Sequence, residues 1–193
     1  MVGIDEGEVE RELVGGRLAC PACRGVLRPW GFARWRVLRG RGGMLLGRRP
    51  RRSICSACGA THVLLPVVGF LRRRDLAEVI GDALVANAAG VGHRRIAGRL
   101  GVHPDTVRGW LRRFAARAVE VREHFTRLAQ GLGADLRVVQ PRASPAADAL
   151  EAIGVAARAA AELFGPAPVW EFASGASGGW LLANTGSPFP AIR

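Results

Sequence analysis

The stretch from His93 to Phe114 constrains the fold of this chain more than any other. Its apolar residues are spaced to give each of two short helices one buried face, and they are Ile96, Leu100, Val102, Val107 and Trp110. Ala97 is small enough to let the two helices approach, and Gly101 supplies the sharp turn between them. Pro104 suits the first turn of the second helix, because its φ is already fixed. The stretch therefore predicts a helix-turn-helix.

The second of these helices presents an outward surface that is polar and basic. We predict that this surface reads base edges in the major groove of double-stranded DNA, through His103, Asp105, Thr106, Arg108 and Arg112. His103 stands where Ser, Asp or Asn would cap the helix better. Either this helix start is weak, or the imidazole faces the nucleic acid.

This helix-turn-helix resembles that of bacterial transposases and regulators, whose second helices often read V-S-P-x-T-V-x-x-W. The matching residues here run from Val102 to Trp110, with His103 in place of the usual Ser. A helix expected over residues 75–89, with Asp75 as its N-cap, comes before the helix-turn-helix. Together they predict a homeodomain-like three-helix domain over residues 72–131. The recognition helix is expected to continue past Phe114, since no helix breaker occurs before Gly131.

Two cysteine pairs, Cys20-Pro-Ala-Cys23 and Cys55-Ser-Ala-Cys58, are each followed closely by glycine. A tight turn of this kind directs backbone N–H groups at the sulfurs, and four thiolates suit tetrahedral Zn²⁺. We predict a zinc-ribbon-like module over residues 17–71, with a long β-hairpin between the pairs. Because four cysteines leave no open coordination position, the zinc is expected to be structural. His62 is an alternative ligand, but it more simply begins a strand over residues 62–68.

Charge is distributed very unevenly along the chain. The net charge is +12, and residues 13–74 hold 14 Arg and no Asp or Glu, which favours a polyanionic partner. Between the cysteine pairs, residues 34–39 alternate as a strand expected to pack Trp35 and Val37 on one face and to expose Arg on the other, before a turn at residues 41–43. The arginines predicted to bind DNA phosphates are Arg34, Arg36, Arg48, Arg49, Arg51, Arg52, Arg94, Arg95 and Arg113.

The amino-terminal part also resembles the zinc-binding segment that precedes the helix-turn-helix in an uncharacterised actinobacterial transposase-like family. The resembling pieces are the two cysteine pairs, Trp30-Gly31 with Ala33-Arg34, and residues 61–66. This resemblance concerns the order of the domains and implies no activity.

The remaining segments are less distinctive. We expect residues 1–16 to be a flexible acidic end and residues 132–145 to be a linker. Residues 146–193 are expected to hold an Ala-rich helix and an apolar tail of unknown role. The small residues of this helix allow close packing, either onto the core, which we favour, or against a second copy in a homodimer. The expected fold is thus mainly α with a small β part.

The sequence predicts a DNA-binding protein without a catalytic domain. The region after residue 131 contains acids, but it lacks the strands of a ribonuclease-H-like sheet that would hold two metal ions. We expect a transcriptional regulator or a transposase-derived targeting module, cytoplasmic and associated with the nucleoid, with no membrane segment and no small-molecule substrate. The alternative is a zinc-ribbon interaction protein that binds RNA or a protein partner.

Overall fold

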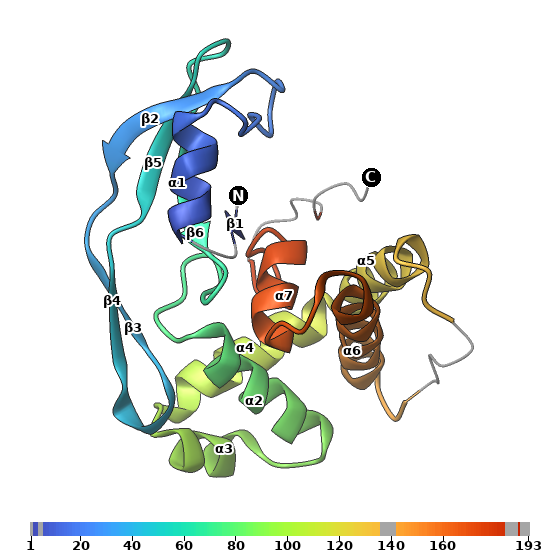
Figure 1. The fold of residues 1–193 in the computed structure, drawn as a ribbon. Helices are drawn as coiled ribbons and strands as arrows, with labels where there is room; N and C mark the ends of the chain where they lie inside the picture. The colour runs from blue at the N-terminus through green and yellow to red at the C-terminus, as the bar shows by residue number, and fades with distance from the viewer. Residues whose placement is uncertain (1, 4–5, 136–141, 184–188, 190–193) are drawn as a thin grey trace.

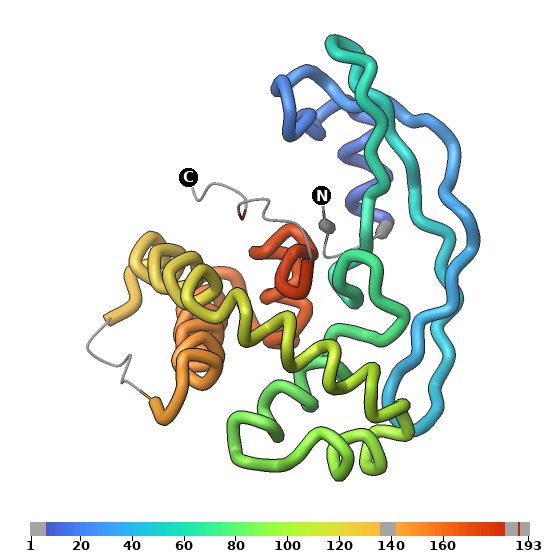
Figure 2. The backbone as a smooth tube through the Cα atoms, turned by 180° about the vertical axis from the view of Figure 1, so that it is seen from behind, coloured from blue at the N-terminus to red at the C-terminus, as the bar shows by residue number. Residues whose placement is uncertain are grey.

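The computed structural model describes residues 2–3, 6–135, 142–183 and 189 (Figures 1 and 2). A long β-ribbon, formed by the strands between residues 27 and 66, runs along one side of the molecule (Figure 1). A group of helices lies beside its lower half (Figure 1). The prediction of a mainly helical chain with a small β part is confirmed. Residues 136–141 of the predicted linker, and parts of the predicted amino-terminal segment and tail, lie outside the described residues. Among the described residues, no helix has the length and apolarity that crossing a membrane requires.

The strands form a four-stranded sheet and a separate two-stranded hairpin. The sheet has the order β1-β6-β5-β2, in which β1 pairs parallel with β6 and the other pairs are antiparallel. In the hairpin, β3 and β4 are joined by the short 3₁₀ turn η1. The bounds are β1 Val2–Gly3, β2 Leu27–Phe32, β3 Arg36–Arg39, η1 Arg41–Gly43, β4 Leu45–Arg48, β5 Arg51–Cys55 and β6 Thr61–Pro66.

The amino-terminal segment contains a helix where we expected a flexible end. Residues Glu6–Val14 form α1, whose Leu13 is fully buried against Leu27 and Leu64 of the sheet. Glu10 of this helix accepts two hydrogen bonds from Arg51, at 2.8 and 3.0 Å. The acidic segment is therefore ordered by one apolar anchor and by its attraction to the arginine-rich sheet.

The hairpin buries the opposite face from the one that we predicted. Leu38 is 7% exposed, whereas Trp35 and Val37 are 64% and 44% exposed. Leu38 pairs with Leu46, and both pack on the core of the helical part. Successive residues of a strand point to opposite faces, so burying Leu38 necessarily turns Val37 outward.

In the described part of the chain, six helices follow the ribbon and share one hydrophobic core. They are α2 Ala77–Ala88, α3 His93–Leu100, α4 Pro104–Ala116, α5 Ala118–Gly131, α6 Pro145–Phe164 and α7 Val169–Ala176. The core includes Ile80, Phe114, Phe125, Ile153 and Leu181, which come from both predicted helical segments. The Ala-rich helix α6 lies along α5 (Figure 1), so the carboxy-terminal segment packs on the helix-turn-helix region.

One local expectation for the helices is wrong, and another is confirmed only in part. Asp75 is not the N-cap of α2: the capping position is Leu76, and Asp75 is 3% exposed and paired with Arg39 of the ribbon. The helix that begins at Pro104 does continue past Phe114, but only to Ala116, where α4 ends, and α5 begins at Ala118 and runs to Gly131. The guanidinium of Arg117 instead turns inward, donates to the Trp180 carbonyl at 2.8 Å, and pairs with Glu120 at 2.9 Å. At both boundaries, therefore, the side chain makes a contact with a residue distant in the sequence.

Candidate functional site

The pair α3–α4 has the geometry that its sequence predicts. Ile96, Val107 and Trp110 are buried between the helices, and Leu100 is half-buried. Gly101 has φ +64°, a left-handed conformation that favours glycine, and the N–H of Val102 donates to the Ala97 carbonyl at 3.1 Å. The turn therefore fixes the direction of α4 relative to α3.

The side chain of His103 caps the start of α4. Its Nδ1 accepts a hydrogen bond from the Asp105 N–H at 3.2 Å, so the imidazole caps the helix, with Pro104 in the first turn. Asp105 also pairs with Arg108 at 3.0 Å, and both side chains are exposed. His103 keeps only Nε2 for an outside ligand, and Asp105 holds Arg108 on the outward surface.

The outward side of α4 forms the wall of an open groove of about 640 Å³, here called the recognition groove. It contains four of the five predicted base-reading residues, since His103 does not line it. Its lining residues are Arg73, Asp105, Thr106, Arg108, Gly109, Trp110, Arg112 and Arg113.

A second open groove, of about 710 Å³, lies along β3 and is here called the ribbon groove. Six arginines surround an apolar floor in this groove. Its lining residues are Arg34, Trp35, Arg36, Val37, Leu38, Arg39, Leu45, Arg72, Arg73 and Arg74. Arg73 lines both grooves, and Asp105 is the one carboxylate among the residues that line them. The surface of α4 and the surface of the ribbon therefore meet at Arg73.

Arg73 carries a charge that no carboxylate balances among the described residues. It donates to the Leu182 carbonyl at 2.7 Å, and its buried Nε has no hydrogen-bond partner. Burial, followed by the charges of Arg113 and Arg72, lowers the pKa of this guanidinium. Arg72–Arg74 are not among the arginines predicted to bind phosphates, although three successive arginines before α2 are a visible signal in the sequence.

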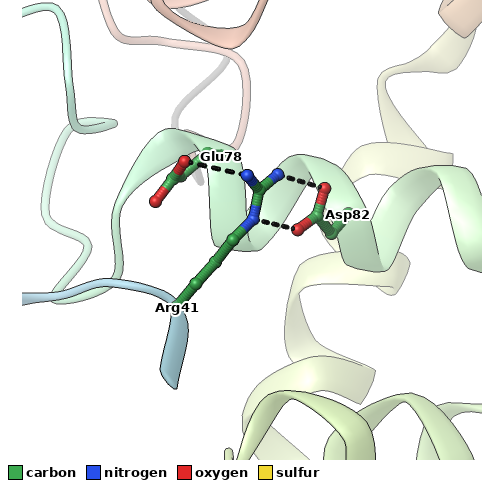
Figure 3. Close-up of polar contacts among 3 residues, drawn as sticks. All are labelled: Arg41, Glu78 and Asp82. Carbon is green, nitrogen blue, oxygen red and sulfur yellow. Dashed lines mark hydrogen bonds and ion pairs between the residues drawn. The ribbon is translucent and has the colours of Figure 1, made fainter. Parts of the chain in front are cut away.

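The ribbon is fixed to the helices by backbone and side-chain contacts. The Arg39 N–H donates to the Arg74 carbonyl at 2.7 Å, and the Leu76 N–H donates to the Arg39 carbonyl at 2.9 Å. Arg39 Nε also lies 3.0 Å from Asp75 Oδ1. This contact is an ion pair, and Oδ1 accepts no hydrogen bond. At the hairpin tip, Arg41 binds Asp82 and Glu78 of α2 (Figure 3). These contacts hold the two grooves in a fixed relationship.

The predicted phosphate-binding arginines differ in how free they are. Among the described residues, Arg34, Arg36, Arg49 and Arg52 form no ion pair, whereas Arg51 is paired with Glu10. Arg49 and Arg51 also lie over the Phe32 ring, 5.3 and 4.5 Å from its centroid. Arg48 faces Arg36 across the hairpin and donates to the Gly47 carbonyl. On the helices, Arg94 and Arg95 are exposed on α3, and Arg113 is half-buried on α4.

The four cysteines come together as one candidate metal site where β5 ends. Their sulfurs all lie within 4.8 Å of one another, and all four thiols are free. Cys23 Sγ is 3.4 Å from Cys55 Sγ, and Cys20 Sγ is 3.9 Å from Cys58 Sγ. Sulfurs at 2.3 Å from a tetrahedral ion are separated by about 3.8 Å, so these separations are near those that a metal requires.

The two cysteine turns repeat the same backbone hydrogen bonds. The Cys20 N–H donates to the Gly25 carbonyl, and the Cys55 N–H donates to the Ala60 carbonyl. The two glycines act differently, however. Gly59 adopts φ +69°, as a sharp bend requires, whereas in the first turn Arg24 takes the positive φ. Gly25 instead makes room, because a Cβ there would meet Ala57 and the Cys55 sulfur.

The electrostatics of the thiol cluster favour a cation. Hydrogen bonds from the backbone N–H groups of Cys58 and Ala57 help to lower the pKa of Cys55 to about 6. The Gly25 N–H favours the Cys23 thiolate, but neighbouring sulfurs and burial raise the pKa of Cys23 to about 12. The cluster cannot carry four negative charges at neutral pH unless a cation balances them.

His62, the alternative ligand, lies beside this cluster. Its Nε2 is 3.4 Å from Cys20 Sγ, which is hydrogen-bonding distance to sulfur, while the four cysteines by themselves make up a complete tetrahedral set. His62 thus has the position of a residue outside the metal-binding set that holds one of the ligands, Cys20, in place.

The comparisons with known proteins bear on the helical part. No curated protein and no solved structure matches the chain. A family model described as a homeodomain-like domain matches residues 72–120, the stretch that contains α2, α3 and α4. Residues 72–120 thus resemble a homeodomain-like domain, which supports a helix-turn-helix DNA-binding unit at this place.

Proposed function

We propose that this chain is a non-enzymatic DNA-binding protein. In this proposal α4 reads base edges in the major groove, and the arginine-rich ribbon binds phosphates of the same duplex. The protein then acts as a transcriptional regulator or as a targeting module derived from a transposase. The observation that carries the proposal is the position of Arg73, which lines both grooves and joins the surface of α4 to that of the ribbon.

The proposed contacts divide into two kinds. Arg108, Arg112 and Thr106 are exposed or half-exposed on α4, where side chains of a recognition helix reach base edges. Arg94 and Arg95 near the start of α3, and the unpaired ribbon arginines, meet phosphate oxygens. The first kind selects the site, and the second supplies most of the affinity.

The test combines selection of bound sequences with salt titration. Duplexes selected from a random pool give a cognate site, and log K for it falls with log salt at a slope of about −5 if about six phosphates are neutralised. Arg108→Ala weakens cognate binding by about 1–3 kcal/mol and relaxes the sequence preference. Arg158→Ala, an exposed arginine on α6, removes the same charge and leaves the preference unchanged.

Two outcomes contradict this function. If log K does not change with salt concentration, nucleic-acid binding is rejected. If Arg108→Ala binds cognate and random duplexes with the wild-type ratio, α4 does not read bases in the way proposed.

We also propose that the four cysteines hold a structural Zn²⁺. Two of the four cysteines, Cys20 and Cys55, are buried in a small core with Leu13, Leu27 and Leu64, whereas Cys23 and Cys58 are exposed, so a metal ion would link this core to the two cysteine turns and contribute directly to folding of the ribbon. Cys20→Ser or Cys55→Ser lowers bound zinc and destabilises the ribbon. Elemental analysis of protein purified without chelator checks this, and the absence of any bound metal rejects the site.

A further inference from the structure

We propose that the ribbon groove binds an unpaired stretch of nucleic acid, with one base stacked on Trp35 and its phosphates held by the flanking arginines. The inference rests on the nucleic-acid function proposed above. It concerns a different surface from the recognition groove, and a different form of nucleic acid from the duplex.

Trp35 has the placement of a stacking platform. It is more than half exposed, whereas Trp110 is buried in the helical core. The ring lies against Gly47 of β4, because a Cβ at that position would overlap the carbons of the indole. One side of the ring therefore rests on backbone and the remainder is open to solvent. A ring fixed in this way loses little freedom when a base stacks on it.

The surroundings of Trp35 fit the charge of a nucleic-acid backbone. Arg34 and Arg36 are its chain neighbours, and neither forms an ion pair among the described residues. Arg72, Arg73 and Arg74 line the same groove. The nearby carboxylate, Asp75, is buried and already paired with Arg39. Six arginines around an apolar floor suit a ligand with flat apolar faces and closely spaced negative charges.

An intact duplex cannot contact both the arginines of this groove and the face of Trp35 in the way proposed. Its phosphates are accessible, but its base faces are stacked on one another, so an indole can cover a base only where the base is unstacked. Alternating contacts to phosphate and to base face are the mode by which proteins bind single strands. Trp35 is therefore expected to discriminate between single and double strands, and the arginines are not.

The test measures binding of the full-length protein to three fluorescent probes. They are oligo-dT and oligo-U of about twelve nucleotides each, within the usual site size, and a duplex of the same length. Trp35→Ala weakens binding to the single strands about 5- to 100-fold and changes duplex affinity less than twofold. Trp35→Phe restores most of the loss. Leu45→Ala, which removes another exposed apolar side chain of the same groove, has less than a twofold effect.

The two single-stranded probes distinguish DNA from RNA, and tight binding of either supports the proposal. The exposure of Trp35 and Leu45 means that neither substitution removes core packing, and circular dichroism of each variant checks the fold. Arg108→Ala leaves single-strand binding unchanged, because Arg108 lies outside the ribbon groove.

Three results overturn the inference while leaving the proposed function intact. The first is duplex binding without single-strand binding. The second is an equal loss of both on Trp35→Ala, which indicates phosphate contact alone. The third is an equal loss of single-strand binding in Leu45→Ala and Trp35→Ala, which indicates a general apolar docking surface. If no probe binds and no duplex is selected, the proposed function fails as well.

Discussion

Arg41, at the tip of the ribbon hairpin, donates two hydrogen bonds to the carboxylate of Asp82 on α2, at 2.7 and 2.8 Å (Figure 3). In the sequence, Arg41 and Asp82 are separated by β4, β5, β6 and the start of α2. The bidentate geometry sets direction as well as distance. This pair, with Glu78 beside it, fixes the far end of the hairpin on the helical part that carries α4.

Breaking this contact is expected to affect DNA binding more than stability. Both side chains are more than a third exposed, so Asp82→Asn changes the free energy of unfolding by less than about 1 kcal/mol. Duplex affinity nevertheless falls about threefold to tenfold, because the ribbon must then be ordered on binding. Asp82→Asn makes the protein more positive, so charge alone would strengthen binding. An increase in affinity, measured by fluorescence anisotropy, contradicts a role for the pair in orienting the ribbon.

Two glycines of the helix-turn-helix are expected to respond in opposite directions to the same substitution. Gly101 has φ +64°, so Gly101→Ala is strained and destabilises by about 1–2 kcal/mol. Gly98 lies within α3 with open space at its Cβ position, so Gly98→Ala stabilises by up to about 1 kcal/mol. Thermal unfolding of the two variants checks the turn. A stabilising Gly101→Ala is incompatible with the left-handed conformation at that position.

The helix-turn-helix was predictable because its information is local. Helical spacing of apolar residues, a glycine at the turn and a proline in the first turn of α4 all lie within one short stretch. Each cysteine pair was also visible in the sequence, since one tight turn brings two sulfurs together, but the pairing of β2 with β5 is what places the two turns side by side.

What the sequence did not reveal depended on distant residues. Val37 and Leu38 are both apolar, and only the docking of the hairpin on the helical core decides which of them is buried. Asp75 fits the sequence pattern of an N-cap, but its carboxylate is paired with Arg39 instead. Arg117 is an acceptable helix residue, yet it lies at the break between α4 and α5, where its side chain donates to the distant Trp180 carbonyl. The meeting of the two grooves at Arg73 is a tertiary feature of the same kind.

A buried histidine connects α5 to the carboxy-terminal segment. His124 is 2% exposed, and its Nε2 lies 3.0 Å from the Ala176 carbonyl, which can only accept. Its Nε2 therefore carries the proton in this contact. The ring also makes an edge contact with Phe125 and lies 4.8 Å from the Phe189 ring, between centroids. Burial is the main cause that lowers the pKa of His124 below its usual range, because the charged imidazolium is poorly solvated there.

The lowered pKa predicts that acid destabilises the fold through this residue. The unfolded chain binds a proton near pH 6.5, while the folded chain resists it, so the contribution of His124 is present above pH 6.5. That contribution is lost as pH falls toward the lowered pKa, at no more than about 1.4 kcal/mol per pH unit. Wild type is therefore expected to lose more stability between about pH 7 and pH 5 than His124→Gln does.

The measurement is denaturant unfolding of both proteins at several pH values, read as the difference between them. Using the difference removes the acid sensitivity that other groups, including the cysteine cluster, contribute to both curves. His93→Gln, a substitution of the half-buried histidine that begins α3, serves as the control and is expected to follow wild type. Parallel curves for wild type and His124→Gln would show that the folded state protonates His124 as readily as the unfolded chain does. In that case burial does not penalise the imidazolium, which can still donate from Nε2 to the Ala176 carbonyl.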